Sequence, residues 1–268
     1  MALKEDIGTG DITTLSCVDE DAVSEARLIA KEDGILCGIE IFRHVYALID
    51  ARVAVDAVLK DGDAMAKGDL IATVNGPSRA MLSGERVALN LLQHLSGIAT
   101  KTGEYADILR VSKAHIVDTR KTTPGMRGLE KYAVRVGGGH NHRFSLADAV
   151  LIKDNHIKAA GGIASAVLRA RNAAPFTMKI EVECETILQV REALAAKADI
   201  IMLDNMSNEQ MKAAVQEING RAIVEASGNM GDKDAAGIAA AADTGVDVIS
   251  IGALTHSVKA LDISLKFS

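Results

Sequence analysis

A charged or polar side chain stands at the end of nearly every apolar run in the second half of this 268-residue chain. Lys153 follows one such run, Glu183 closes another and Asp204 follows a third. A charge beside buried apolar residues is costly unless it is paired or binds a ligand. The polar run ends are residues 118–121, 153–155, 183, 204–205, 227–229 and 252. We interpret these positions as parts of one binding site.

Two of these residues are acids that end successive runs. Parallel strands would bring the carboxylates of Glu183 and Asp204 to the same edge of a sheet. Paired carboxylates that face cations suit a hydroxylated, phosphorylated ligand carrying Mg²⁺, because Mg²⁺ prefers oxygen ligands and cations bind phosphate. We therefore expect the two acids to bind sugar hydroxyls or the hydrated metal ion.

The cations are concentrated in residues 110–158, which hold ten Lys or Arg against four acids, although the whole chain carries −6. A local excess of +6 focuses positive potential on one cleft and suits a small polyanion. Arg120, Lys121, Arg143 and Lys153 stand at or beside run ends. A solvated charged surface is the alternative, and the clustering at run ends makes it a weaker explanation for these four residues.

Helix capping is the competing explanation for polar run ends. A turn from strand to helix needs a side chain that accepts from the first free N–H groups of the helix. Ser207 or Asn208 could cap the next helix and so account for residues 204–205. Capping does not account for Lys153 or Glu183, so we favour a binding site.

Residues 136–143 form a glycine-rich segment that contains His140 and His142. Glycine lets the backbone turn tightly or approach a ligand closely. Two histidines two residues apart, without a third ligand, make a poor zinc site. We expect this segment to contact an anionic ligand instead.

The spacing of the apolar runs predicts the elements that position these residues. Up to about residue 97, short β-like runs lie between turn signals, at residues 26–30, 34–37, 52–55 and 70–74. Beyond it, the expected strands are residues 115–117, 149–152, 179–183, 199–203, 222–226 and 247–251, and the expected helices are residues 162–174, 186–197, 208–218 and 233–244. A helix over residues 83–93 is expected to join the two parts. Alternation of strand and helix predicts parallel strands, with the site at their carboxyl ends.

Composition narrows the class of protein. Three Tyr, four Phe and no Trp leave few rings for stacking on single-stranded nucleic acid. The net charge of −6 disfavours binding to nucleic acid or to an anionic membrane. Three widely separated cysteines fit neither a disulfide framework nor a zinc cluster. The first residues are charged and no apolar run is long enough to span a bilayer, so we expect a cytoplasmic protein.

Many short motifs resemble those of the quinolinate phosphoribosyltransferases, or carboxylating nicotinate-nucleotide pyrophosphorylases. They lie, in the family's order, at residues 5–13, 85–90, 95–100, 118–125, 130–134, 137–143, 151–156, 202–206 and 252–257. The resemblance implies an α/β fold, with an N-terminal α/β sandwich domain over residues 1–97. An incomplete TIM-like α/β barrel would follow over residues 98–268, its C-terminal tail packing back on the first domain.

The resemblance also implies an activity in NAD biosynthesis. Phosphoribosyl would pass from phosphoribosyl pyrophosphate to quinolinate with loss of CO₂, which gives nicotinate mononucleotide and pyrophosphate, with Mg²⁺ as cofactor. Lys121, Lys153, Glu183 and Asp204 would be catalytic, and the two acids would hold Mg²⁺ directly, through water or through substrate. The implied substrate-binding residues are Arg86, Thr119, Arg120, Lys121, His142, Arg143, Lys153, Glu183, Asp204, Ser227, Gly228, Asn229, Ile251, Gly252 and Ala253.

Within that set, the cations and His142 would bind the pyridine dicarboxylate and phosphates. Residues 227–229 and 252–253 would bind the 5′-phosphate. Arg86 would enter from a neighbouring subunit, because family members are dimers with shared sites, or hexamers built from three dimers. The resemblance implies no nucleic-acid or membrane partner.

Some features depart from the family's pattern. The chain begins at the first motif, so we expect a trimmed start; Phe144 and Ser145 replace an aliphatic residue and glycine; and Asn229 replaces glycine. None of these changes removes a charged site residue.

Three other functions compete with this interpretation. A pyrophosphorylase-like paralogue with another acceptor, such as the molybdenum-operon relative, is disfavoured by the intact residues 119–121 and 142–143. A lipoyl- or biotinyl-type carrier is indicated only by the turn-rich residues 61–69, and no modifiable lysine motif follows. A metal hydrolase built on the histidines lacks a credible ligand set.

Overall fold

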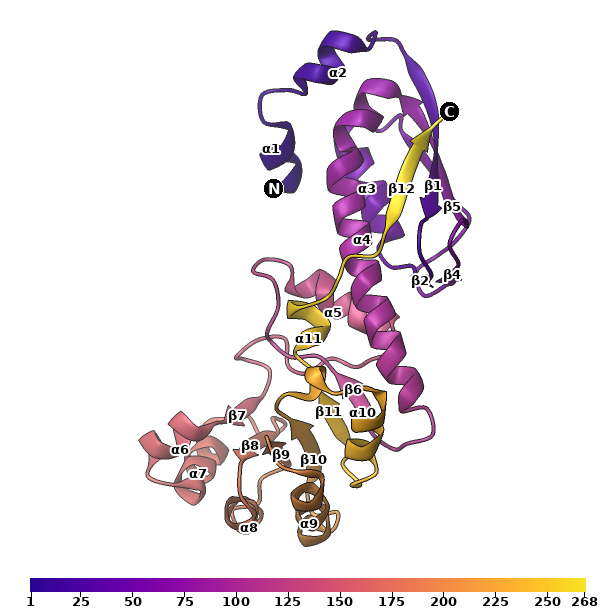
Figure 1. Cartoon of the computed structure of the whole chain (residues 1–268). Helices are drawn as coiled ribbons and strands as arrows, with labels where there is room; N and C mark the ends of the chain where they lie inside the picture. The colour runs from indigo at the N-terminus through magenta and orange to yellow at the C-terminus, as the bar shows by residue number, and fades with distance from the viewer. The chain divides into compact units, whose positions relative to one another are not determined.

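The computed structural model describes all 268 residues, and the chain forms two compact units (Figure 1). The N-terminal unit comprises Met1–Lys101 and Val258–Ser268, and the C-terminal unit comprises Thr102–Ser257. Residues 97 and 98, where the sequence pattern places a domain boundary, lie inside helix α4 (Ser78–Ile108). No helix combines the length and the apolar character that crossing a membrane requires.

An antiparallel sheet of order β12-β1-β5-β3 forms the centre of the N-terminal unit. Besides α4, its elements are α1 (Ala2–Ile7), α2 (Ile12–Cys17), β1 (Val23–Ala30), β2 (Gly34–Ile35), α3 (Ile39–Ile49), β3 (Ala54–Ala57), β4 (Ala64–Met65), β5 (Leu70–Pro77) and β12 (Ile263–Phe267). Strand β1 buries Ala26, Leu28 and Ala30 at alternate positions, as a strand with one covered face does. Phe42 of α3 and Leu92 of α4 belong to the same apolar core, so sheet and helices form the expected α/β layers.

Local hydrogen bonds explain where these elements depart from the sequence pattern. Strand β3 begins two residues later than expected, because the Asp50 side chain accepts from the N–H of Arg52 and holds a turn there. Residues 61–69 serve as scaffold: the Asp61 carboxylate accepts from the N–H groups of Gly38 and Ile39, and β4 pairs with β2.

Helix α4 is far longer than the expected residues 83–93. Gly84 and Gly97 look like helix breakers in the sequence, but each permits a close approach. A Cβ atom on Gly97 would lie 2.3 Å from the carbonyl oxygen of Lys259, and one on Gly84 would lie 2.7 Å from the Ile49 side chain. These glycines are required by packing and do not end the helix.

Six parallel strands of order β6-β11-β10-β9-β8-β7 form the C-terminal unit, and all six correspond to expected strands. Its elements are β6 (His115–Val117), α5 (Arg127–Val136), β7 (Val150–Ile152), α6 (Asp154–Ala160), α7 (Ile163–Ala173), β8 (Ile180–Cys184), α8 (Ile187–Ala195), β9 (Ile200–Asp204), α9 (Asn208–Ile218), β10 (Ile223–Ser227), the 3₁₀ turn η1 (Met230–Asp232), α10 (Ala235–Ala242), β11 (Val248–Ser250) and α11 (Ala253–His256). The outer strands β6 and β7 do not pair, which confirms an incomplete α/β barrel.

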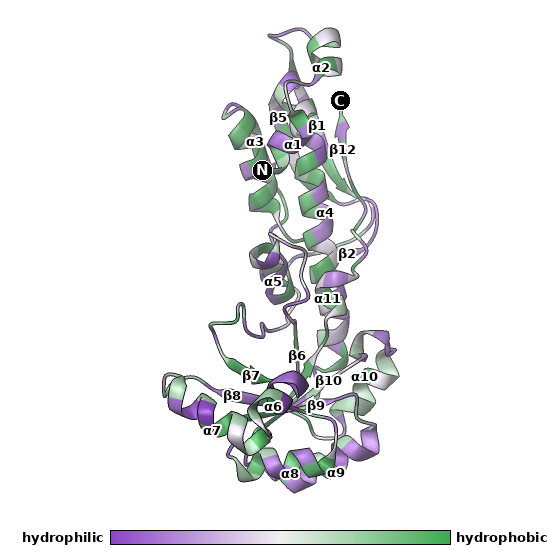
Figure 2. Ribbon diagram, turned by 90° about the vertical axis from the view of Figure 1, so that its left-hand side faces the viewer, coloured by the Kyte–Doolittle hydropathy of each residue, from purple (hydrophilic) through white to green (hydrophobic).

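The crossover helices of this unit are amphipathic, as expected. Figure 2 shows hydrophilic and hydrophobic residues alternating along α8 and α9. Ser207 caps α9: its hydroxyl accepts from the N–H of Gln210, whose side chain accepts from the N–H of Ser207. Helix α5 was not expected, because its buried face contains Glu130 and Lys131 beside Ala133 and Val134, and the charged pair interrupts the usual apolar stripe.

Candidate active site

A cavity of about 640 Å³ opens at the carboxyl ends of the parallel strands of the C-terminal unit. Each strand contributes through the residues that follow it or close it, which is where α/β barrels carry their active sites. The expected site residues that line the cavity are Thr119, Arg120, Lys121, His142, Arg143, Lys153, Glu183, Asp204, Ser227, Gly228, Asn229, Gly252 and Ala253. Most of the polar run ends therefore lie at one cavity, but Asp118, Asp154 and Asn155 are not part of its lining.

Two expected residues do not line this cavity. Ile251 is fully buried, and its N–H donates to the carbonyl of Val117 between two strands. Arg86 lies exposed on α4, in the N-terminal unit.

Several cavity residues were missed by the sequence analysis, among them Glu225, Ser250 and His256. Glu225 carried a usable signal, since it is an acid inside an otherwise apolar strand. Attention to strand ends alone overlooks such a residue, because a side chain in mid-strand can also face the interior of a barrel.

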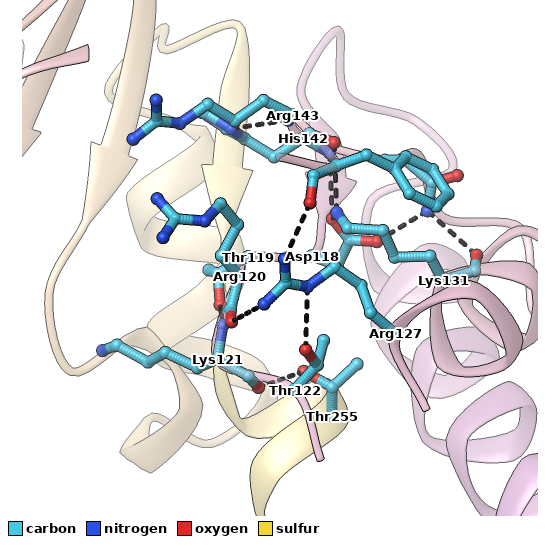
Figure 3. A network of polar contacts seen from close by, with 12 residues as sticks. Asp118, Thr119, Arg120, Lys121, Thr122, Arg127, Lys131, His142, Arg143 and Thr255 are labelled. Carbon is cyan, nitrogen blue, oxygen red and sulfur yellow. Dashed lines mark hydrogen bonds and ion pairs between the residues drawn. The ribbon is translucent and has the colours of Figure 1, made fainter. Parts of the chain in front are cut away.

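Three cations gather on one side of the cavity. Figure 3 shows the side chains of Arg120, Lys121 and Arg143 extending to the same side. Burial lowers the pKa of Arg143, and the nearby positive charge of Arg120 lowers it further. The Nε atom of Arg120 is buried without a hydrogen-bond partner. Two adjacent guanidinium groups with an unused donor favour an anion between them, because it would relieve the repulsion and accept the free N–H.

Two acids occupy the ends of the neighbouring strands β8 and β9. The Nζ of Lys153 lies 2.5 Å from the Oε2 of Glu183, so this part of the cavity carries both signs of charge. Burial raises the pKa of Asp204, and the nearby Glu183 raises it further. A cation between the two carboxylates would relieve their repulsion.

His142 and two buried acids form a second charged group. The Nε2 of His142 lies 3.1 Å from a carboxylate oxygen of Glu181 and 3.5 Å from one of Glu225. Burial lowers the pKa of an imidazole, but the hydrogen bonds with these acids outweigh it and raise the pKa of His142 to about 10. Burial also raises the pKa of Glu181, against the hydrogen bond from His142, which lowers it.

These three side chains lie close enough together to hold a metal ion, but the orientation of the ring argues against one. The Nδ1 of His142 accepts from the N–H of Arg143 at 2.8 Å, so the single proton of a neutral ring sits on Nε2. A ligating histidine instead presents one bare nitrogen to the metal and donates from the other.

The turns after β9 and β10 interlock at Gly228, where φ is +86°. The N–H of Asn205 donates to the carbonyl of Ser227, and the side chains of Asn229 and Asn205 are 3.3 Å apart. A Cβ atom on Gly228 would lie 2.2 Å from the Oδ1 of Asn205 and 2.7 Å from its backbone nitrogen. Only glycine fits there, so the two turns form one rigid wall of the cavity.

Substitution Gly228→Ala should therefore loosen both turns. We expect faster hydrogen exchange of the backbone amides of residues 204–207 and 227–231. Gly62→Ala is the matched control: Gly62 also has a positive φ, +94°, but nothing lies within 4 Å of its Cβ position. Both variants carry the strain of a left-handed alanine, about 1–2 kcal/mol. Equal exchange in these turns for wild type and Gly228→Ala would contradict the interlock.

Comparison with known proteins places this chain in a family. Residues 11–96 match the family model for the quinolinate phosphoribosyl transferase N-terminal domain, and residues 98–266 match that for the C-terminal domain. A probable carboxylating nicotinate-nucleotide pyrophosphorylase of Bacillus subtilis (strain 168) is 50% identical over 261 residues, which cover 97% of this chain and 89% of the relative. The chloroplastic carboxylating enzyme of that name from Arabidopsis thaliana is 44% identical, over 99% of this chain and 80% of the relative.

Solved structures agree with the sequence relatives. The crystal structure of NadC from Streptococcus pyogenes is 47% identical, has a TM-score of 0.94 and covers 100% of this chain and 94% of that chain. The nicotinate-nucleotide pyrophosphorylase from Francisella tularensis is 43% identical, has a TM-score of 0.94 and covers 100% of this chain and 93% of that chain. The chain thus belongs to the quinolinate phosphoribosyltransferase family in both of its domains.

Proposed function

We propose that this protein transfers phosphoribosyl from phosphoribosyl pyrophosphate to quinolinate and releases CO₂, which yields nicotinate mononucleotide and pyrophosphate. The observation that carries the proposal is the single cavity that joins a cationic side to a pair of acids. Relatives that match nearly the whole chain bear the name of this enzyme. The enzyme would act in NAD biosynthesis, and its cytoplasmic location stays a prediction.

The cationic side suits the first substrate. Quinolinate is a flat ring with two adjacent carboxylates, and the guanidinium groups of Arg120 and Arg143 can bind carboxylates in bidentate fashion. Lys121, Lys153 and His142 border the same space and would complete the contacts to carboxylate and phosphate. These residues would fix the ring so that its nitrogen faces the sugar carbon, which is the positioning that makes a bimolecular step efficient.

The acid pair suits a magnesium-bound sugar phosphate. Mg²⁺ takes oxygen ligands and is commonly held by one or two carboxylates together with substrate phosphates. Glu183 and Asp204 offer such a donor set, and the raised pKa of Asp204, caused first by burial and then by Glu183, fits a site that gains from a cation. When bound, Mg²⁺ supplies charge neutralisation of the leaving pyrophosphate.

The chain's own residues would supply the remaining stabilisation. The bond between the sugar carbon and pyrophosphate breaks through an oxocarbenium-like state, and the carboxylates of Glu183 and Asp204 would lie near its positive charge. The turns at Ser227–Gly228–Asn229 and Gly252–Ala253 would hold the 5′-phosphate through backbone N–H groups. The quinolinate nitrogen forms the new bond to the sugar carbon as the bond to pyrophosphate breaks. The resulting pyridinium ring then loses CO₂, since its positive nitrogen stabilises the carbanion, which takes up a proton from water. No protein nucleophile is required.

The function is tested directly by product analysis. Purified protein given quinolinate, phosphoribosyl pyrophosphate and Mg²⁺ should form nicotinate mononucleotide and CO₂ in equal amounts. Nicotinate, which lacks the second carboxylate, should be rejected. Efficient use of nicotinate without CO₂ release would contradict the proposed substrate, because the cationic side would then not require two carboxylates on its ligand.

Lys153→Ala should lower kcat by about 100-fold or more, the usual loss when one positioned electrostatic contact to a transition state is removed. Lys158→Ala is the matched control, since Lys158 lies on the exposed surface of α6 and pairs with Asp154 away from the cavity lining. Steady-state kinetics with both substrates check this expectation. Near-normal kcat for Lys153→Ala would remove Lys153 from the catalytic set.

We further propose a homo-oligomer, a dimer or three dimers in a hexamer, in which Arg86 completes the neighbour's site. Arg86→Ala and Lys153→Ala subunits should each have strongly reduced activity alone. A heterodimer of the two places both defects in one site and leaves the other intact, so mixing should restore up to about half of the wild-type rate on simple site counting. Isolated heterodimers without activity would contradict shared sites.

A further inference from the structure

Three polar residues beside the cavity do not line it, yet they connect the segments that do. Asp118 directly follows β6, Lys131 lies on α5, and Asn141 lies in the glycine-rich segment after α5. Asp118 and Lys131 are fully buried. Because none of the three is part of the cavity lining, direct contact with a ligand does not explain them.

Asp118 gathers three donors from two other segments. Its carboxylate accepts from the Nζ of Lys131, from the Nδ2 of Asn141 at 2.6 Å and from the N–H of His142 at 2.9 Å. The next two residues in the chain, Thr119 and Arg120, line the cavity. Asp118 therefore ties the Arg120 segment directly to the His142 segment.

Lys131 holds the same segment from the other side. Besides Asp118, its Nζ donates to the carbonyl of His142 at 3.1 Å and lies 5.2 Å from the centre of the Phe144 ring. The N–H and the C=O of His142 are thus both held, one by the acid and one by the lysine. With its backbone held on both sides, His142 contacts the buried acid Glu181, and the next residue, Arg143, lines the cavity.

Helix α5 also holds the two segments through a second residue. Arg127, one turn before Lys131, donates to the hydroxyl of Thr122 at 3.0 Å, to the carbonyl of Phe144 at 3.0 Å and to the carbonyl of Arg120 at 3.4 Å. One rigid helix therefore contacts both cation-bearing segments. Arg127 and Lys131 each contact both segments, so the helix fixes the position of one segment relative to the other.

Stability alone is a poor reason to keep this ion pair. Burial raises the pKa of Asp118 and lowers the pKa of Lys131, so the surroundings disfavour both charges. A buried ion pair often adds little over apolar residues of the same volume, but its hydrogen bonds demand one geometry. Here that geometry is the spacing of the cationic side of the cavity.

We propose that Asp118, Lys131 and Asn141 are positioning residues that hold Arg120 and Arg143 at the spacing required by a planar dicarboxylate. The proposal rests on the proposed function for the identity of that ligand. The buried network therefore affects how the cavity binds the pyridine dicarboxylate. It has little influence on the turns after β9, β10 and β11.

The test uses the double variant Asp118→Asn, Lys131→Met in the full chain. It removes both charges together, so neither is left buried alone, and nearly preserves side-chain volume. We expect KM for quinolinate to rise at least tenfold, with a smaller change in KM for phosphoribosyl pyrophosphate and in kcat. If the network only stabilised the fold, the double variant would contain less folded enzyme and show a lower apparent kcat. The KM for quinolinate would then not rise more than the KM for phosphoribosyl pyrophosphate.

Lys113→Met is the matched control, since Lys113 also pairs with an acid, Asp247, in the same unit and does not line the cavity. Its kinetics should equal those of wild type.

Hydrogen exchange provides a readout that needs no substrate: the backbone amides of residues 141–144 should exchange faster in the double variant than in wild type. If wild type fails to use quinolinate, the proposed function is wrong, and exchange still decides the positioning role. Unchanged exchange in these residues, or equal changes in both KM values, would overturn the proposal.

Discussion

The carboxyl ends of parallel strands meet at one edge of a sheet, and every charged group of the candidate site depends on that constraint. Arg120, Lys153, Glu183 and Asp204 come from four different strands, yet all line one cavity. Of these four, Lys153 and Glu183 form an ion pair, while Arg120 and Asp204 form none with the others. The strands thus leave Arg120 and Asp204 available for ligands in the same cavity that holds the Lys153–Glu183 ion pair.

Buried charges next to this cavity fall into two kinds. In the Asp118 network both carboxylate oxygens have protein donors, so the network is complete without a ligand. Glu181 and Glu225 share the proton of His142 and each keep one buried oxygen without a partner. The first kind holds backbone in place, and the second keeps unused acceptor capacity at the cavity. Such a division suits a reaction that depends on positioning and electrostatics more than on covalent participation.

Local chemistry made much of the architecture predictable. The six barrel strands could be found because strands covered on both faces are continuous apolar runs, and the cap at Ser207 could be found because a serine three residues before glutamine forms a capping box. Helix α5 could not, because Glu130 and Lys131 point inward where apolar residues are normal. The full length of α4 could not be predicted for a similar reason. Gly84 and Gly97 are required because residues distant in sequence pack closely against them.

The sequence by itself determined which residues carry charge and that these charges follow strands, because hydrophobic periodicity is a local property of the chain. It also identified the family, through motifs whose order spans nearly the whole chain. Only the tertiary structure decided which charges meet. Three contacts join residues that are 13 to 39 positions apart: Asp118 with Lys131, Lys153 with Glu183, and His142 with Glu181. Strand order and burial determine which of these residues meet, and no local sequence pattern encodes either of them.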